Sequence, residues 1–316
     1  MNLSPTTTTA RHVTAAAGAL SVALLCAACG SSTSGDSPGG GGGSSTRPLS
    51  VVASTNVWGD VAQAVGGEDV TVSSIISDPS QDPHSFEANT KTLLMVSKAQ
   101  VVIENGGGYD DFMGRMTKSS GSEATVINAV DVSGKEAPAD GELNEHVWYD
   151  FATVEKVVDV IATRLGRARP EDAQAFTRRA DALSSKIDAL VDEESSIKRQ
   201  FAGKTIGITE PVPLYLTEAC GLVNTTPEEF SEAVEEGDDV SPAVLKRTLD
   251  QYTTGKVDAL VYNAQTSGPV TEKVEAAAKR NGTGVVPVTE TLPEGLDYVS
   301  WMGQNLDHLR AALGHQ

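Results

Sequence analysis

The chain has 316 residues, with 24 Lys and Arg against 43 Asp and Glu and only three cysteines. This length is typical of about two ordinary domains and is ample for a hydrophobic core without a disulfide framework. The formal net charge is −19. Such acidity argues against a protein that binds nucleic acid or an anionic membrane surface through charge, because those partners attract basic surfaces.

The N-terminal segment is typical of an export signal. Residues 1–28 contain one basic residue, Arg11, and no acidic residue, and Val13–Leu25 is a run of 13 apolar and small side chains. The run is too short to span a bilayer as a helix and fits the apolar region of a secretory signal peptide. The small residues before Cys29 resemble a bacterial lipobox, which makes Cys29 the predicted lipidated first residue of the mature chain. The alternative is a plain signal peptide in which this cysteine has no role.

A Gly/Ser-rich segment follows the predicted anchor. Of the 17 residues in 30–46, 13 are Gly or Ser, and this composition buries too little apolar surface to become ordered. As a flexible coil it would span about 20–25 Å. We therefore expect a signal peptide over 1–28 and a lipid anchor with a disordered tether over 29–47, holding an exported domain at the outer face of the cell membrane. Cys220 is then left without a disulfide partner and is expected to be a small buried side chain.

From Arg47 onward, short apolar runs alternate with longer amphipathic stretches. The short runs predict four buried strands: Leu49–Ser54, Val72–Ile76, Val101–Glu104 and Thr125–Asn128. The amphipathic stretches predict helices near Trp58–Val65, Thr90–Lys98, Tyr109–Lys118 and Phe151–Arg167. Strands and helices in alternation predict a parallel sheet with crossover helices.

A long helix is predicted next. Residues 171–200 contain no Gly or Pro, and apolar side chains recur mostly every three or four positions from Phe176 to Ile197, as on one face of a helix. Thirty helical residues would reach about 45 Å, a length that suits a connection between two lobes.

A second alternating set completes the chain. Its predicted strands are Lys204–Thr209, Ala259–Tyr262 and Gly284–Val288, and its predicted helices are Pro242–Gln251, Val270–Asn281 and Asp297–Leu313. The predicted fold is therefore α/β, with two lobes that each contain a small parallel sheet flanked by helices and are joined by one long rigid helix. We expect the N-terminal lobe over 48–169, the linking helix over 170–200 and the C-terminal lobe over 201–316.

Four polar residues follow predicted strands, where open parallel sheets bind their ligands. His84 follows the second strand and His146 lies in the loop after the fourth, whereas Glu210 and Glu290 directly follow two strands of the second lobe. The other three histidines lie in the signal peptide or near the C-terminus: His12, His308 and His315. Two neutral imidazoles and two carboxylates would form a neutral site around a divalent ion. The spacing of these four residues is also compatible with histidines in ordinary loops and acidic residues at the surface that bind no metal.

Three segments carry a family resemblance: Asp82–Glu87, Glu104–Phe112 and Glu145–Tyr149. A looser match lies in Glu290–Met302. With these segments the chain, from about Pro48 to its C-terminus, resembles the metal-specific solute-binding proteins of bacterial ABC importers, the zinc and manganese binding lipoprotein family.

The resemblance implies one metal ion in the cleft between two α/β lobes. The ligands that it implies are His84 and His146 from the first lobe, and Glu210 and Glu290 from the second. In the family the third ligand is commonly His or Glu and the fourth is usually Asp. Glu290 departs from that habit, and Glu294 and Asp297 are alternatives for the fourth position.

The expected cargo is one divalent transition-metal ion, Mn²⁺ or Zn²⁺. Glu210 in the third position resembles the manganese-binding branch, because an added oxygen ligand suits a harder ion. Zinc-binding relatives often carry a His-rich acidic loop before the second ligand, and Asp131–Glu145 contains no histidine before His146. Manganese is therefore slightly favoured over zinc, and iron is less favoured, although most such sites bind zinc more tightly in vitro.

The expected function is capture and not catalysis. An extracytoplasmic, monomeric solute-binding lipoprotein would close modestly about its long helix and deliver the ion to an ABC-type import permease; no catalytic residue and no organic cofactor is predicted. A secreted metallohydrolase is a different possibility, but the chain lacks a His-Glu-x-x-His motif and four protein ligands leave little room for a substrate. The sequence also leaves open a binder of a small organic solute and a surface adhesin.

Overall fold

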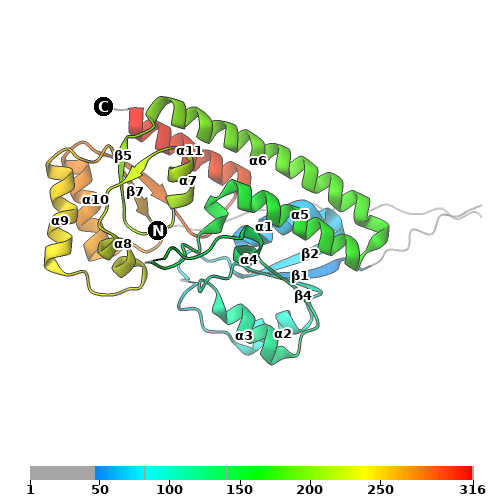
Figure 1. Ribbon diagram of the computed structural model, residues 1–316. Coiled ribbons are helices and arrows are strands. Elements are labelled where there is room, and N and C mark those ends of the chain that lie inside the picture. The colour runs from blue at the N-terminus through cyan, green and yellow to red at the C-terminus, as the bar shows by residue number, and fades with distance from the viewer. Residues whose placement is uncertain (1–46, 82, 140, 315–316) are drawn as a thin grey trace, which may run out of the picture. The chain divides into compact units, whose positions relative to one another are not determined.

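The computed structural model describes residues 47–81, 83–139 and 141–314. The predicted signal peptide, the predicted lipidation site Cys29 and most of the predicted tether lie outside the described residues. The described residues contain two parallel sheets and one long helix (Figure 1). No helix in the described part of the chain is long and apolar enough to cross a membrane.

The first sheet has the strand order β2-β1-β3-β4, and all of its strand pairs are parallel. Its strands are β1 Leu49–Thr55, β2 Val70–Ile76, β3 Val101–Glu104 and β4 Thr125–Asn128. The helices of this lobe are α1 Asn56–Gly66, α2 Thr90–Ser97, α3 Asp111–Ser120, α4 Ala129–Ser133 and α5 Phe151–Ala168, with 3-10 turns at Gly67–Asp69 and Val147–Tyr149.

Side chains of β1 alternate between two hydrophobic layers, as the two-residue repeat of a strand requires. Val51 and Ala53 join the core that contains α1 and α5, whereas Val52 joins the layer formed with α2 and α3. Because both faces are covered, the strand is buried almost throughout, and its central apolar run, Val51–Ala53, made its position predictable.

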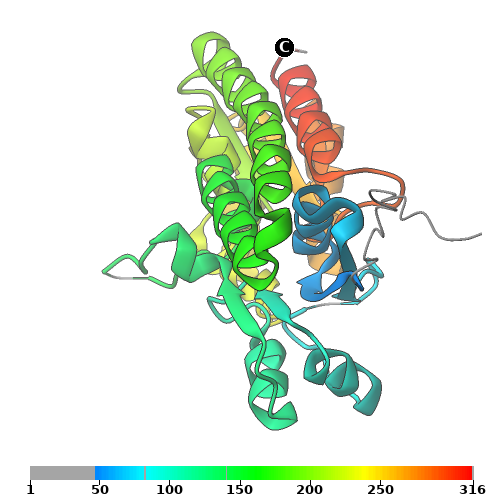
Figure 2. The ribbon, with the colours of Figure 1, turned by 90° about the vertical axis from the view of Figure 1, so that its right-hand side faces the viewer.

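Helix α6, Ala173–Phe201, is 29 residues long and follows a 3-10 turn at Pro170–Asp172. Its buried stripe runs from Phe176 to Ile197, and it packs against α5, α1 and α11, Tyr298–Gly314. Figures 1 and 2 show α6 beside α11, from the C-terminal half, and α1, from the N-terminal half. The predicted long helix is confirmed.

The second sheet has the order β6-β5-β7-β8 and is also parallel. Its strands are β5 Thr205–Ile208, β6 Val223–Asn224, β7 Ala259–Asn263 and β8 Gly284–Val288. The helices around it are α7 Leu214–Ala219, α8 Glu228–Glu235, α9 Pro242–Thr253, α10 Pro269–Arg280 and α11. The two-lobe α/β fold is therefore as predicted.

Both lobes share one hydrophobic core. The core that includes Val51 of β1 and Phe176 of α6 extends to Val261 of β7 and Trp301 of α11. Polar contacts also join the halves: the Asn56 side chain donates to the carbonyl of Leu292 at 2.8 Å and accepts from its amide at 2.9 Å. The lobes are therefore held together by shared apolar and polar contacts, and large relative movement would break this core. The predicted lobe boundaries remain a proposal.

Candidate metal centre

His84 lies in the loop between β2 and α2, which is shaped at both ends by local side-chain hydrogen bonds. Asp78 accepts from the amide of Ser80 at 2.9 Å, and Asn89 caps α2 with a capping box. The imidazole of His84 stands edge-on to the ring of Tyr109, with centroids 5.1 Å apart. Its side chain keeps 28% of its surface exposed, so the ring borders both the core and the solvent.

His146 is buried and its orientation is set by Asn144. The Asn144 Oδ1 atom lies 2.8 Å from His146 Nδ1 and also accepts from the His146 amide at 3.1 Å. Nδ1 therefore carries the proton, and Nε2 presents a lone pair. Burial lowers the pKa of His146 well below its usual value, and His84 lowers it further. A neutral imidazole with one nitrogen oriented by a hydrogen bond is the form in which histidine binds a metal.

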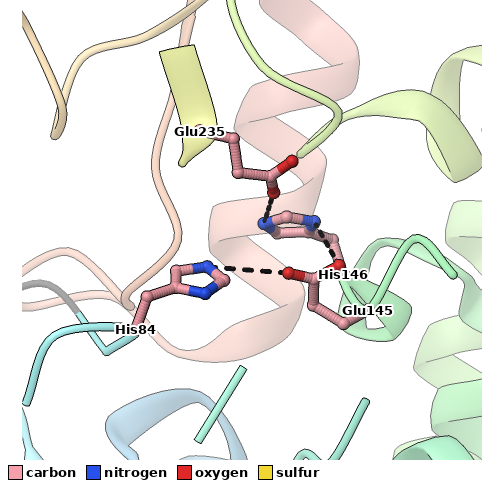
Figure 3. A group of neighbouring side chains, drawn as sticks. All are labelled: His84, Glu145, His146 and Glu235. Atoms are coloured by element: carbon pink, nitrogen blue, oxygen red, sulfur yellow. Dashed lines mark ion pairs between the residues drawn. The ribbon is translucent and has the colours of Figure 1, made fainter. Parts of the chain in front are cut away.

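Glu145 and Glu235 complete a four-residue group with the two histidines (Figure 3). His84 Nε2 lies 3.6 Å from Glu145 Oε1, and His146 Nε2 lies 3.5 Å from Glu235 Oε1. One potential ligand atom from each of the four residues lies within 4.8 Å of the others. Such a group can enclose one ion, because nitrogen and oxygen ligands approach transition metals at about 2.0–2.2 Å.

The carboxyl groups in this cluster are electrostatically crowded. Burial raises the pKa of Glu145 to about 7. Burial raises the pKa of Glu235 to about 9, and the charges of Glu145, Glu210 and Glu290 contribute to this rise. A divalent cation would relieve this repulsion, since it favours the charged form of each carboxylate.

Glu210 and Glu290 lie at the carboxyl ends of the second sheet, as predicted from their positions after strands. They are 2% and 3% exposed. Asn263, the last residue of β7, donates from Nδ2 to Glu210 Oε2 at 2.6 Å and to Glu290 Oε1 at 2.8 Å, and the Thr266 hydroxyl also donates to Glu210. One amide group therefore holds both predicted ligands of this lobe.

The structure thus groups His84 with His146, and Glu210 with Glu290. The second pair is not part of the four-residue group, but its charges act on Glu235, and Glu290 acts on the buried hydroxyl of Tyr109 between the histidines. The two pairs consequently face the same region. The assignment of the four residues as ligands stays a prediction.

Two other predictions concern residues among those described. Glu294 and Asp297, the alternatives to Glu290, are exposed, and Asp297 accepts from the amide of Ser300 at 2.7 Å in the first turn of α11. Glu290 is therefore the buried carboxylate of the three. Cys220 is fully buried, as predicted, and burial raises its thiol pKa to about 12.

Glu145 and Glu235 were not predicted as members of the site. Glu145 lies in a segment that carried the family resemblance and directly precedes His146. Its position beside a predicted ligand could therefore have been noticed. Glu235 ends a short acidic helix, Glu228–Glu235, far from any predicted strand end. Nothing in the local sequence distinguishes it from the acids around it.

The cluster opens into a cleft of about 1300 Å³. His84, Glu145 and Asn144 line it from the N-terminal half of the chain, and Glu232, Glu235 and other acids of α8 line it from the C-terminal half. The wall is therefore strongly acidic. A cleft of this charge concentrates cations and repels anionic solutes.

Replacing Asn263 with alanine is expected to lower metal affinity about 10–100-fold, as is usual when a group that orients metal ligands is lost. The variant would remove the donor that holds Glu210 and Glu290. Titration calorimetry should show weaker binding with an unchanged stoichiometry of one ion. Asn281→Ala, at the exposed end of α10, is the matched control. Equal affinity in both variants would show that Asn263 does not orient the ligands.

Two lobes joined by a long helix, with imidazoles and carboxylates at their facing edges, define a two-lobe cation-binding protein. A family model described as zinc-uptake complex component A, periplasmic, matches residues 51–312. The chain therefore belongs to this family, which confirms the resemblance seen in its sequence motifs.

Individual relatives agree with this assignment. The manganese-binding lipoprotein MntA of Halalkalibacterium halodurans is 27% identical over 206 residues, covering 64% of this chain and 66% of that protein. The manganese ABC transporter substrate-binding lipoprotein scaA of Streptococcus gordonii is 23% identical over 290 residues, covering 85% and 90%. Among solved structures, the periplasmic zinc-binding protein TroA of Treponema pallidum superposes with a TM-score of 0.69 at 19% identity, covering 84% and 99%, which supports the fold.

Proposed function

We propose that this chain is the extracytoplasmic binding component of an ABC-type metal importer. It captures one divalent transition-metal ion at the facing edges of its lobes and delivers the ion to a membrane permease. The observation that carries this proposal is the convergence of two histidines with two carboxylates at the edge of one acidic cleft. Family membership and the names of the relatives support it.

The site is suited to binding and not to turnover. His146 is held as a neutral ligand, and His84 stands at the rim of the cleft. Glu210 and Glu290 supply negative charge that offsets that of the ion. A hydrolytic metal site needs an open position for water and a nearby general base, whereas these residues would surround the ion. Capture without chemistry is the proposed activity.

The shared hydrophobic core limits the motion that accompanies binding. We propose a modest closure about α6, because this helix packs on elements of both halves of the chain. The protein acts as a monomer held at the outer face of the cell membrane by a lipid on Cys29. The lipoprotein names of both relatives support this location.

Manganese is the proposed physiological cargo. Glu210 supplies a hard oxygen ligand, and both of these lipoprotein relatives are named for manganese. Zinc is still expected to bind tightly in vitro, since nitrogen and oxygen sites generally follow the Irving–Williams order. The identity of the bound ion therefore reflects supply and coordination geometry as well as affinity.

Elemental analysis of the protein purified from its native envelope tests this proposal. About one manganese ion per chain is the expected result, with zinc as the main competitor. Competition titrations of the metal-free protein should then show stoichiometric uptake of either ion and no turnover of ester, peptide or phosphate substrates. Absence of metal uptake by the metal-free protein, or catalytic turnover by the metal-loaded protein, would contradict the proposal.

A further inference from the structure

Glu235 faces the nitrogen of His146 that would bind an ion. It is the last residue of α8, in the C-terminal half of the chain, and its Oε1 atom is 3.5 Å from His146 Nε2. Because the Nδ1–H group of His146 donates to Asn144, the Nε2 atom carries no proton. Both atoms are buried, and neither makes a hydrogen bond within 47–81, 83–139 and 141–314. Two buried polar atoms that face each other without a hydrogen bond are typical of a site that holds a third group.

Among the ion pairs of the described residues, Glu235 has no Lys or Arg partner. An acidic side chain in the last turn of a helix is unfavourable, because the carbonyl groups at that end carry partial negative charge. The neighbouring acids Glu232 and Glu236 lie nearer the solvent, which screens their charge, whereas Glu235 turns inward.

We propose that Glu235 supplies a further carboxylate oxygen to the captured ion and biases the site toward hard ions with high coordination numbers. This inference rests on the proposed function of the site. Zinc in protein sites is usually four-coordinate, and the four predicted ligands would already satisfy it. An additional oxygen is of more use to Mn²⁺, which favours six oxygen-rich ligands. Glu235 therefore contributes to selectivity for manganese over zinc.

Three variants of the full chain, purified in detergent, test this role. Glu235→Gln keeps the shape of the side chain and weakens it as a ligand, and Glu235→Asp keeps the charge but shortens the reach. Glu236→Gln removes the same charge from the adjacent position and is the matched control. Affinities for Mn²⁺ and Zn²⁺ are measured by competition with a chromogenic chelator, and the manganese environment is followed by electron paramagnetic resonance.

Both Glu235 variants are expected to lower the Mn²⁺ affinity by at least about 10–100-fold, the loss usual for an outer partner of a metal ligand. The Zn²⁺ affinity should fall much less, because four ligands remain for zinc. The manganese spectrum should change in both. Glu236→Gln should alter both affinities slightly and equally, since it removes only long-range attraction.

Equal losses for the two ions, or losses no larger than in Glu236→Gln, would overturn the role of Glu235 as a ligand. That outcome would leave the proposed function intact, because the parent protein would still bind metal. Failure of the parent protein to bind either ion would instead overturn the proposed function itself.

Discussion

Replacement of His146 with alanine is expected to reduce the affinity for both Mn²⁺ and Zn²⁺ by more than about 100-fold. Loss of an outer partner of a metal ligand already costs about 10–100-fold, and His146 is proposed as a ligand itself. Its Nε2 atom is the only ring nitrogen left for an ion, since Nδ1 is held 2.8 Å from Asn144 Oδ1. His84→Ala is expected to have a similar effect on affinity.

The two histidine variants differ in what they do to the fold. His146 is 1% exposed, so its truncation leaves a small cavity beside Trp148, whose ring centroid is 5.0 Å away. The side chain of His84 is 28% exposed, and its loss should leave the unfolding temperature unchanged. His84→Ala therefore separates the loss of a ligand from the loss of packing.

Titration calorimetry measures the affinities, and tryptophan emission provides a second readout because Trp148 lies beside the site. The matched control is His308→Ala, which removes an exposed imidazole on α11. Unchanged metal affinity in His84→Ala and His146→Ala would contradict the placement of the site. A loss of affinity in all three variants would indicate a general effect of histidine removal.

The fold was largely predictable because its elements are long or continuously apolar. The buried strands β1 and β3 are short apolar runs, and the stripe of α6 follows the helical periodicity; both signals depend only on local geometry. Four short elements were missed: α4, α7, β6 and α8. Strand β6 has two residues, and α8 has only Phe230 as a buried apolar anchor, so neither shows a repeat long enough to detect.

The same limit explains which parts of the site were found. Residues that directly follow the strands, such as Glu210 and Glu290, could be placed together because the carboxyl ends of parallel strands meet at one edge. The position of Glu235 depends on where the end of α8 packs, and that is set by tertiary contacts. The role of Asn144 in orienting His146 depends on a local side-chain contact between the two residues. Composition and spacing do not reveal such a contact.

Replacement of Glu194 with glutamine is expected to stabilise the protein at alkaline pH. Glu194 lies on α6 and is 6% exposed, and its Oε1 atom makes no hydrogen bond among the described residues. Burial raises its pKa to about 8, with a smaller contribution from the charge of Asp150. An acid whose pKa is higher in the folded state binds more protons there than in the unfolded chain. Stability therefore falls as the pH rises from about 4.5, the usual value, to about 8.

The expected gain for Glu194→Gln is several degrees in unfolding temperature at pH 8.5 and little at pH 5. Each pKa unit corresponds to about 1.4 kcal/mol, so the ionised carboxylate lowers the free energy of unfolding by a few kcal/mol at the higher pH. Glutamine removes this destabilisation and keeps the size of the side chain. Thermal unfolding of the metal-free protein at the two pH values measures the difference. Glu193→Gln is the control, because Glu193 pairs with Arg310 at 2.9 Å and its removal should not stabilise the fold. A gain in Glu194→Gln that is equal at both pH values would show that better packing, and not removal of a buried charge, is responsible.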